Sequence, residues 1–471
     1  MFDLIPWLDE TYIVEMGRLF LSGGDANSTL MGSSPVSLMP FCYLGPLLQE
    51  VLFRLGGQLA VRLSPFVGLM VMAVAFGVYL KRTTTLPRLE RRVFALAVLV
   101  SPIAFQCALL TRVDTWALAA IWCALAALAC PEGRLRTKTT LAVAAGFSVV
   151  AVFVWPTAFL FGPLVVAAFS WSRRREFAWF CGFSAIFMIL LLIPIATRLD
   201  VFVAAFSRHY QEVAAPTPTV VSGILAVARE IARDPLLSVF VGYGVWRWLI
   251  ERRWGLLAAM LVSVAVAIHA GLYVFRLAYL LPFAFLATVR AVESLRARHA
   301  CWARSAVFAL AAYGLLTGPI GHFALTYPTL PEDLTQALAE TVGTGPIRVF
   351  APDHATYYIG RELGWIQLGF ARPNEAENSE LLSRVLADCD YVVLRDFDPY
   401  TPFQQSCTPY GLFCQYVLQK AKTERNLPDS QKSWAARFGS QFSFAWHCPL
   451  RFVGFEECCR QEPIRILRRA R

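Results

Sequence analysis

The sequence is poor in charged residues. Only 16% of its 471 residues are charged, whereas 57% are hydrophobic and the mean hydropathy is +0.51. A soluble protein usually has about 25% charged residues, so an ordinary soluble enzyme is excluded. The hydrophobic residues gather in long blocks that end near Leu325. These features predict an integral membrane protein that carries a soluble domain at its C-terminal end.

Ionisable residues are nearly absent from the interiors of these blocks. The notable polar residues there are Gln106, His269 and His322, toward the outer ends of their blocks. A transporter would instead place ionisable groups in mid-membrane or show internal repeats, and the sequence shows neither feature. The blocks predict an α-helical polytopic membrane protein of about ten spans. The expected spans are 63–80, 93–110, 115–131, 139–155, 157–171, 177–196, 236–250, 254–274, 277–292 and 303–325.

Lys and Arg occupy every second loop between these spans. Short loops rich in basic residues stay on the cytoplasmic side of a membrane. The expected topology therefore places residues 1–61 and 326–471 on the outer face, with a transmembrane helical domain at 62–325 between them. The net charge of +10 then follows from topology, and no nucleic-acid partner is expected. The basic loops are Lys81 to Arg92, Arg134 to Lys138, Arg173 to Arg175, Arg247 to Arg253 and Arg290 to Arg304.

The sequence has no secretory signal peptide before Asp9, because neither a basic segment nor an apolar one precedes that residue. The outer segment is therefore expected to begin either as a short acidic tail or downstream of an earlier start codon. Within this segment, 10–21 and 40–55 combine apolar and charged residues. Both stretches predict helices that lie in the membrane interface.

The outer domain at 326–471 alternates helix-like and strand-like segments. Helix-like 332–342 precedes strand-like 347–350, and helix-like 377–387 precedes strand-like 391–394. This alternation predicts a small α/β soluble domain with some parallel strands. Weaker strand patterns occur at 441–446, 450–455 and 464–468.

The same domain contains no C-x-x-C pair, so the spacing of a typical zinc site is lacking. It does contain an even number of cysteines. On the outer face this number predicts at least one disulfide, with free thiols as the alternative. The cysteines are Cys389, Cys407, Cys414, Cys448, Cys458 and Cys459.

Acidic residues gather at the expected outer membrane surface, beginning with Asp9 and Glu10. In a structural role, Asp9 would cap the first interfacial helix by accepting backbone N–H bonds near Tyr12, and Glu10 would interact favourably with the helix dipole. In a catalytic role, a carboxylate would take a proton from an incoming hydroxyl group. Adjacent helical residues point roughly 100° apart, so one residue would be the base while the other binds a metal or orients a nearby group.

A second acidic position is Arg112-Val113-Asp114, at the outer end of an expected span. It is either an interfacial ion pair in a tight turn, or a site in which Asp114 lies opposite Asp9 and Arg112 contacts a phosphate. Arg276 lies at the same expected level. It either extends to the interface as an anchor or contacts an anionic head group.

These stretches resemble the GT-C superfamily of polyprenyl-phosphate-sugar glycosyltransferases, which includes protein O-mannosyltransferases, aminoarabinose transferases and the lipid A core galacturonosyltransferase group. Their order and topology cover most of residues 5–395, and an outer α/β tail similar to 345–395 recurs in the family. The matching stretches are Asp9-Glu10-Thr11-Tyr12 through Arg18, Tyr43-Leu44-Gly45-Pro46-Leu47, Arg112-Val113-Asp114, and Arg276-Leu277-Ala278-Tyr279-Leu280-Leu281-Pro282.

Two features depart from the family pattern. Such proteins begin with a cytoplasmic N-terminus and a first span before their Asp-Glu loop, and no such span precedes Asp9 in this sequence. The second interfacial helix begins with Leu38-Met39-Pro40, where the family often has a Pro-Pro or His-Pro-Pro entry.

The resemblance implies a GT-C-like fold and a sugar donor carried on a polyprenyl phosphate. A hydroxyl of a glycan, lipid or protein acceptor would attack the anomeric carbon in one inverting displacement. The resemblance nominates Asp9 as the general base, with Glu10 and Asp114 as further catalytic residues. Asp114 would orient the acceptor or help to hold a divalent metal such as Mg²⁺ or Mn²⁺. The substrate-binding residues that it implies are Tyr12, Arg18, Arg112, Arg276 and Tyr279.

Two hypotheses about function follow. The first is a membrane glycosyltransferase in a bacterial inner membrane, with its soluble domain on the periplasmic face and membrane lipid as a partner. The second is a non-enzymatic membrane protein, such as a transporter, a flippase or a degenerate GT-C relative. Outer carboxylates and span interiors without charge favour the first hypothesis, whereas a true lack of the first span would favour the second.

Overall fold

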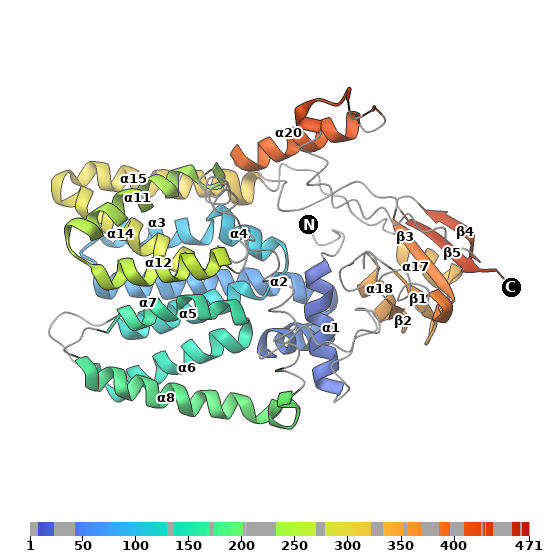
Figure 1. Ribbon diagram of the computed structural model, residues 1–471, viewed down its shortest axis with the longest axis horizontal. Helices are drawn as coiled ribbons and strands as arrows, with labels where there is room; N and C mark the ends of the chain where they lie inside the picture. The colour runs from blue at the N-terminus through green and yellow to red at the C-terminus, as the bar shows by residue number, and fades with distance from the viewer. Residues whose placement is uncertain are drawn as a thin grey trace.

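The protein consists of an elongated helical bundle and a small sheet domain beyond one end of it (Figure 1). The helix α1 (Leu8–Ser22) lies crosswise between these two parts (Figure 1). The computed structural model describes residues 8–22, 43–129, 136–169, 173–200, 203, 232–269, 278–321, 333–351, 356–368, 386–395, 409–424, 427–428, 430–436, 455–461 and 464–470.

The bundle is built from helices that run along its long axis (Figure 1). Each expected span coincides with one or two of these helices. They are α2 (Leu44–Thr83), α3 (Arg88–Leu99), α4 (Pro102–Leu109), α5 (Asp114–Leu128), α6 (Lys138–Val154), η2 (Pro156–Phe161), α7 (Gly162–Ala167), α8 (Arg174–Leu192), η4 (Ile193–Arg198), α11 (Pro235–Ile250), α12 (Trp254–His269), α14 (Leu281–Arg298), α15 (Ala300–Leu315) and η5 (Leu316–Ile320).

The expectation of about ten full-length spans is wrong for the residues that the structure describes. Three helices among them are long and apolar enough to cross a membrane: Leu44–Thr83, Arg174–Thr197 and Ala300–Ile320. A fourth span results if α3 and α4, which are bent by 47° relative to each other, count as one. The remaining apolar helices are shorter, namely Asp114–Leu128, Lys138–Val154, Pro156–Ala167, Pro235–Ile250 and Trp254–Ala267.

The shortfall has physical causes in the sequence. The 15 residues of α5 give a helix of about 22 Å, whereas the hydrocarbon core of a bilayer is about 30 Å thick. Pro102 and Pro156 each begin a new helical segment, because proline cannot donate the hydrogen bond that continues a preceding helix. The second half of α14 is too polar for a span, since it carries Arg290, Glu293 and Arg296.

A break divides α2 into two helices, as the sequence predicts. Gly56 and Gly57 depart from helical geometry, and Gly57 has a φ of 60°, which favours glycine because a Cβ would be strained there. The amphipathic part before the break corresponds to the interfacial helix expected at 40–55. The apolar part after it corresponds to the span expected at 63–80.

The outer surface of the bundle is apolar. Val74, Val239 and Leu261 are 68%, 68% and 63% exposed. Such large apolar side chains on a continuous surface are typical of contact with lipid rather than water. The interior is packed with aromatic rings, and Phe76 contacts both Phe94 and Trp122 edge to face.

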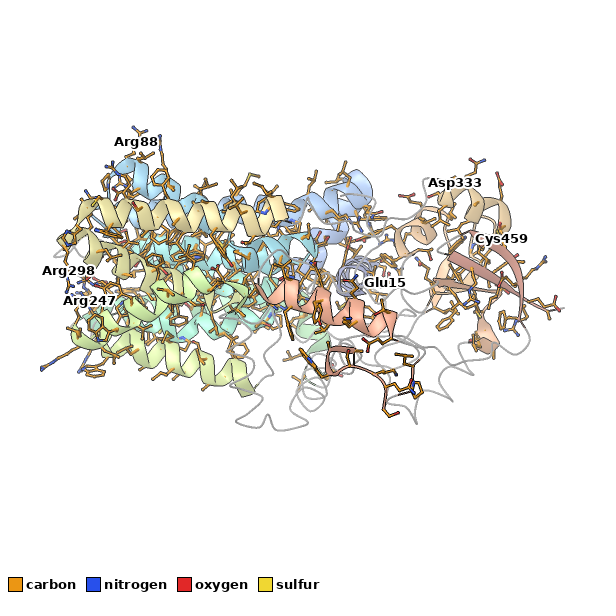
Figure 2. The ribbon with its side chains drawn as sticks, turned by 90° about the horizontal axis from the view of Figure 1, so that it is seen from above. Glu15, Arg88, Arg247, Arg298, Asp333 and Cys459 are labelled. Atoms are coloured by element: carbon orange, nitrogen blue, oxygen red, sulfur yellow. The ribbon has the colours of Figure 1, made fainter. Side chains whose placement is uncertain are left out.

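Arginines gather at the end of the bundle that is remote from the sheet. Arg88, Arg247 and Arg298 lie there, whereas Asp333 and Cys459 lie beyond the opposite end (Figure 2). These three arginines come from three different basic loops. Their common position is what the expected topology requires.

The sheet domain contains five strands in the order β2-β1-β3-β5-β4. The strand β1 pairs in parallel with β2 and β3, whereas β5 is antiparallel to β3 and β4. This arrangement confirms the small α/β domain with some parallel strands. The bounds are α17 (Leu334–Thr341), β1 (Arg348–Phe350), α18 (Tyr357–Glu362), β2 (Ile366–Leu368), β3 (Tyr391–Arg395), α20 (Pro409–Thr423), β4 (Phe455–Gln461) and β5 (Ile464–Arg469).

Expected and observed strands agree at β1, β3 and β5. The sequence does not predict β2, in which the polar Gln367 is buried and the apolar Ile366 is exposed, the reverse of the usual pattern. The strand expected at 450–455 is displaced, because β4 begins at Phe455. The strand expected at 441–446 and most of the helix at 377–387 lie outside the described residues.

Three cysteines of this domain, Cys389, Cys458 and Cys459, are free thiols. The side chains of Cys407, Cys414 and Cys448 lie outside the described residues. An outer-face disulfide therefore stays a prediction for those three.

Candidate functional site

The helix α1 packs against the first half of α2 at the end of the bundle next to the sheet domain. Its apolar face is formed by Ile13 and Val14, which are fully buried. Gly17 permits the close approach, because a side chain at this position would overlap the backbone carbonyl of Pro46. The first turn of α1, which contains Asp9 and Glu10, is therefore held at the junction of the bundle and the sheet domain.

The turn Arg112-Val113-Asp114 reaches the same region. A Cβ built on Gly45 would lie 3.0 Å from a methyl carbon of Val113, so the start of α2 packs directly on this turn. Since α1 contacts the adjacent Pro46, three of the four stretches that carry the family resemblance meet at the start of α2. The fourth reaches this region through Tyr279.

Arg112 and Asp114 form a buried ion pair. Arg112 Nε donates to Asp114 Oδ2 at 2.6 Å, and the two side chains are 2% and 0% exposed. The guanidinium also lies over the ring of Trp155, 5.2 Å from its centroid. The preceding residue, Thr111, has a φ of 56°, which is unusual for a residue with a β-branched side chain. The tight turn that the sequence predicts here is confirmed, and its ion pair is buried within the protein.

The second carboxylate oxygen of this pair is not satisfied by the protein that the structure describes. Asp114 Oδ1 and the hydroxyl of Tyr279 are both buried and have no hydrogen-bond partner among the described residues. The two groups interact with each other, and the Tyr279 hydroxyl is the nearest candidate donor to the Asp114 carboxylate. A buried oxygen of this kind is costly, so the site has unused capacity to bind a donor.

Three further carboxylates are buried where α1, α2 and the sheet domain meet. Glu10, Glu15 and Glu50 are 3%, 4% and 0% exposed. Each has an arginine partner from α1 or α2, because a buried charge must be paired. The pairs are Arg62 Nε to Glu10 Oε1 at 3.1 Å, Arg18 Nη2 to Glu15 Oε1 at 2.6 Å, and Arg54 Nε to Glu50 Oε1 at 2.8 Å.

The short helix α18 of the sheet domain contacts all three of these carboxylates. The hydroxyl of Tyr358 donates to Glu10 Oε1 at 2.8 Å, and that of Tyr357 donates to Glu15 Oε2 at 3.0 Å. Arg361 donates to both oxygens of Glu50, at 2.7 and 3.1 Å. We call Tyr357, Tyr358 and Arg361 the α18 clamp.

The clamp is embedded in an apolar cluster. Burial, and then the charges of Glu15 and Glu10, hold the pKa values of Tyr357 and Tyr358 well above their usual range. Both phenols therefore stay protonated and act as hydrogen-bond donors at neutral pH. The cluster consists of Tyr12, Val14, Val61, Tyr357 and Tyr358, with Met16 and Phe53 beside them.

The residues expected at the site differ in burial, and some of them lie outside the described part of the chain. Asp9 lies within the first turn of α1, one residue after the start at Leu8, rather than before the helix as a cap. The side chain of Asp9 and all of Arg276 lie outside the described residues. Tyr12 and Tyr279 are buried, whereas the Arg18 side chain is 38% exposed and paired with Glu15. Substrate contacts for these residues stay predictions.

Glu10 has partners that differ from those of a metal ligand. Its described partners, Arg62 and Tyr358, are both hydrogen-bond donors. Sequence reasoning missed its contact with the sheet domain and the similar roles of Glu15 and Glu50. The sequence did contain a signal, namely three acidic residues on two amphipathic helices. A carboxylate that becomes buried there requires a hydrogen-bond donor.

The described residues contain no group of three or more His, Cys, Asp or Glu side chains that could hold a metal ion. Asp114 is bound to Arg112, and Glu10 is bound to Arg62 and Tyr358. These two carboxylates are therefore engaged by donors in the part of the chain that the structure describes.

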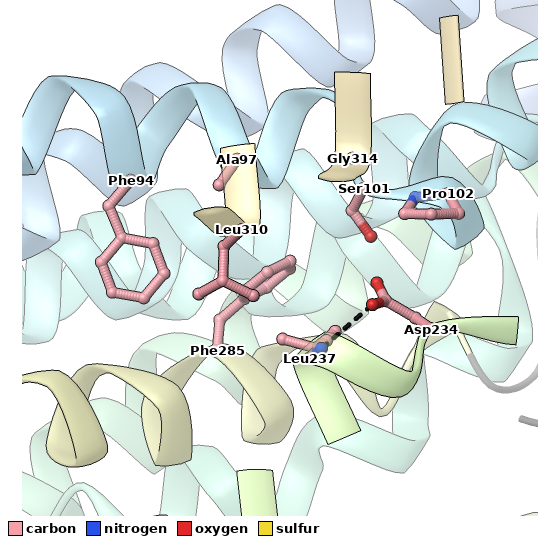
Figure 3. Close-up of a pocket in the computed structure, with 9 residues that line it drawn as sticks. All are labelled: Phe94, Ala97, Ser101, Pro102, Asp234, Leu237, Phe285, Leu310 and Gly314. Atoms are coloured by element: carbon pink, nitrogen blue, oxygen red, sulfur yellow. Dashed lines mark hydrogen bonds between the residues drawn. The ribbon is translucent and has the colours of Figure 1, made fainter. Parts of the chain in front are cut away.

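A small cavity inside the bundle contains another carboxylate (Figure 3). Asp234 accepts a hydrogen bond from the backbone N–H of Leu237 at 3.0 Å, so it caps α11. The hydroxyl of Ser101, at the bend between α3 and α4, points toward it (Figure 3). The lining residues come from α3, α4, α11, α14 and α15 and the residues just before α4 and α11, and neither Asp9 nor Asp114 is among them.

Comparison with known proteins identifies the fold. No protein-family model and no curated protein matches the sequence. ArnT from Cupriavidus metallidurans bound to undecaprenyl phosphate aligns over 99% of this chain and 94% of its own length, with a TM-score of 0.57 and 10% identity. The apo form of that protein aligns over 83% of this chain and 88% of its own, with a TM-score of 0.50 and 13% identity.

An oligosaccharyltransferase from Archaeoglobus fulgidus in its apo form is also similar. It aligns over 83% of this chain, with a TM-score of 0.52 and 12% identity. The chain spans 64% to 66% of the length of the oligosaccharyltransferase chains that it matches.

These neighbours are GT-C glycosyltransferases, so the chain has a GT-C fold, which is a polytopic membrane fold. The resemblance that the sequence carries is confirmed at the level of the fold. With identities of 10% to 13%, the likeness extends to the fold alone.

Proposed function

We propose that this protein is a membrane glycosyltransferase that moves a sugar from a polyprenyl phosphate to a hydroxyl acceptor at the outer face of the membrane. The observation that carries the proposal is the alignment of nearly the whole chain, 99%, with ArnT bound to undecaprenyl phosphate. The convergence of α1, the start of α2 and the Arg112-Val113-Asp114 turn at one end of the bundle supports it.

The proposed reaction is a single displacement with inversion. The acceptor hydroxyl attacks the anomeric carbon, and the bond from that carbon to the phosphate oxygen breaks. The polyprenyl phosphate leaves with the bonding electrons, and Asp9 takes the proton of the hydroxyl as general base. The position of Asp9 at the outer end of the bundle suits a donor whose phosphate lies at the level of the head groups.

The leaving phosphate needs positive charge that is already in place. Arg112 is fixed by Asp114 and by the ring of Trp155, so it can donate a hydrogen bond without reorganising. The Arg112–Asp114 pair has no net charge, however. We therefore assign the balancing charge to Arg276. Asp114 Oδ1 would accept a hydrogen bond from a second donor group of the acceptor and so orient it, because the attacking hydroxyl gives its one proton to Asp9.

The substitution Asp9→Asn tests the assignment of the base. It removes the carboxylate, and the rate of sugar transfer should fall by roughly 10²-fold or more. Stability should change by less than about 1 kcal/mol, because the lost term is the interaction of one charge with the helix dipole. The assay measures release of undecaprenyl phosphate from undecaprenyl-phosphate-linked sugars in vesicles that contain the purified protein and a membrane extract as acceptor.

The matched control is Asp388→Asn, because Asp388 lies in the same protein on an exposed surface, with a side chain that is 69% exposed. Its turnover should equal that of the wild type. An Asp9→Asn variant that folds normally and transfers sugar at the wild-type rate would refute the base assignment. Wild-type protein that binds undecaprenyl phosphate no better than undecaprenol, which lacks the phosphate, would favour a non-enzymatic role.

A further inference from the structure

The short helix α18 of the sheet domain contacts both α1 and α2. Through its clamp residues, α18 binds Glu10 and Glu15 on α1 and Glu50 on α2. Tyr357 and Arg361 are also linked to each other, with Arg361 Nη1 3.4 Å from the Tyr357 hydroxyl. The clamp therefore holds α1 at two points and α2 at one.

Charge neutralisation does not explain these contacts. Each of the three carboxylates already has an arginine from α1 or α2 within 3.1 Å. The two tyrosines add no charge and contribute only directed hydrogen bonds. Hydrogen bonds of this kind fix the orientation of the groups that they join, and in a buried site their loss is costly.

The two contacts on α1 fix its rotation about its own axis. Glu10 and Glu15 are more than one helical turn apart, so holding both leaves the helix little freedom to roll or to tilt. Asp9 directly precedes Glu10 in the same turn. Whatever sets the position of Glu10 therefore also sets the position of the backbone that carries Asp9.

We infer that the α18 clamp is a positioning element for catalysis: Tyr357 and Tyr358 of the outer domain hold α1 so that its first turn presents Asp9 to the acceptor. Glu10 is then a positioning residue that passes this restraint to its neighbour, and it is not a ligand of substrate or metal. The inference rests on the proposed role of Asp9 as the base.

The first test is a double-mutant cycle with Tyr358→Phe and Asp9→Asn. Tyr358→Phe removes one hydroxyl, and kcat should fall by roughly 10- to 100-fold, the scale of a misplaced catalytic group. The KM for the undecaprenyl-phosphate sugar should stay within about twofold, because uniform binding is unaffected. In the Asp9→Asn background, Tyr358→Phe should cause no further loss, because both changes act through the same carboxylate.

The matched control is Tyr416→Phe, since Tyr416 is exposed on α20, away from α18 and the clamp. Its kcat should equal that of the wild type in both backgrounds. If the losses of kcat from Tyr358→Phe and Asp9→Asn multiply in the double variant, the inference is overturned. The two changes would then act independently, and the clamp would only stabilise the fold. Equal kcat for Tyr358→Phe and wild type would overturn it as well.

The second test does not depend on activity. Hydrogen exchange of the α1 amides should speed up on the order of tenfold in Tyr358→Phe and Tyr357→Phe, and should not change in Tyr416→Phe. Unchanged exchange in both clamp variants would show that α18 does not hold α1. If exchange rises but Asp9→Asn is fully active, the proposed base fails while the restraint on α1 stands, so the two failures are distinguishable.

Discussion

Several charged side chains are buried at the end of the bundle next to the sheet domain. Glu10, Glu50 and Asp114 are all at most 3% exposed, yet each has an arginine within 3.1 Å. Sequence patterns place such residues at an interface and cannot show whether a neighbouring helix covers them. For Asp114 the structural alternative, an Arg–Asp pair in a tight turn, is confirmed in geometry. A catalytic role for the same residue stays a prediction.

The Arg112–Asp114 pair can be tested for both roles at once. Asp114→Leu leaves Arg112 buried without its partner, and the free energy of unfolding should fall by about 3 to 5 kcal/mol. The double variant Arg112→Met with Asp114→Leu replaces both charges by apolar groups and should recover most of this loss. Thermal unfolding in detergent measures the stability of each variant.

Sugar transfer separates the two roles. If Asp114 orients the acceptor, the double variant should be stable but slow, by roughly 10²-fold. A double variant that is both stable and fully active would reduce Asp114 to a packing role. One that is as unstable as Asp114→Leu would show that the pair belongs to a larger network of hydrogen bonds.

Helices and strands could be predicted from the sequence where they are long or periodic. The apolar helices of the bundle, the division of α2 into an interfacial part and an apolar part, and the strand β3 are examples. Helix lengths could not be predicted, because hydropathy does not register the bend between α3 and α4. The strand β2 was missed because its polar Gln367 is buried and its apolar Ile366 is exposed.

The packing of α1 on α2 gives a prediction for a whole element. A methyl group in Gly17→Ala would overlap the Pro46 carbonyl, which is backbone and cannot rotate away. The helices must then separate, at a cost of about 1 to 3 kcal/mol, typical of overpacking. The thermal midpoint should fall, and protease cleavage within α1 should become faster.

Gly182→Ala in α8 is the control for this substitution. A Cβ at Gly182 has no neighbour within 4 Å, so this change should be neutral or slightly stabilising, because alanine favours helix. Equal stability of the two variants would show that α1 does not pack closely on α2. Loss of transfer activity in Gly17→Ala alone would link this packing to the site.

The contacts between distant parts of the chain are the ones that could least be predicted from the sequence. The bond from Tyr358 to Glu10 joins residues 348 positions apart. No local pattern reveals such a pair, because each partner is consistent with an ordinary helix surface. The meeting of Gly45 with Val113 is similar. Resemblance to a family could bring these stretches together, but it could not supply the α18 clamp.

The topology of the whole chain is the last prediction. The basic loops should lie in the cytoplasm, and the sheet domain should lie on the outer face. Arg88, Arg247 and Arg298 already share the end of the bundle that is remote from Asp333 and Cys459 (Figure 2). The side of the membrane on which this basic end lies therefore fixes the orientation of the whole chain.

Reporter fusions measure this orientation directly. Alkaline phosphatase, which is active only outside the cytoplasm, should be inactive when fused after Arg174 or Arg252 and active when fused after Arg471. Green fluorescent protein at the same positions should give the opposite pattern, and this serves as the control for expression. Phosphatase activity after Arg174 and Arg252 but not after Arg471 would invert the topology and place the sheet domain in the cytoplasm. Asp9 would then lie on the cytoplasmic side as well, and the outer-face reaction would have to be abandoned.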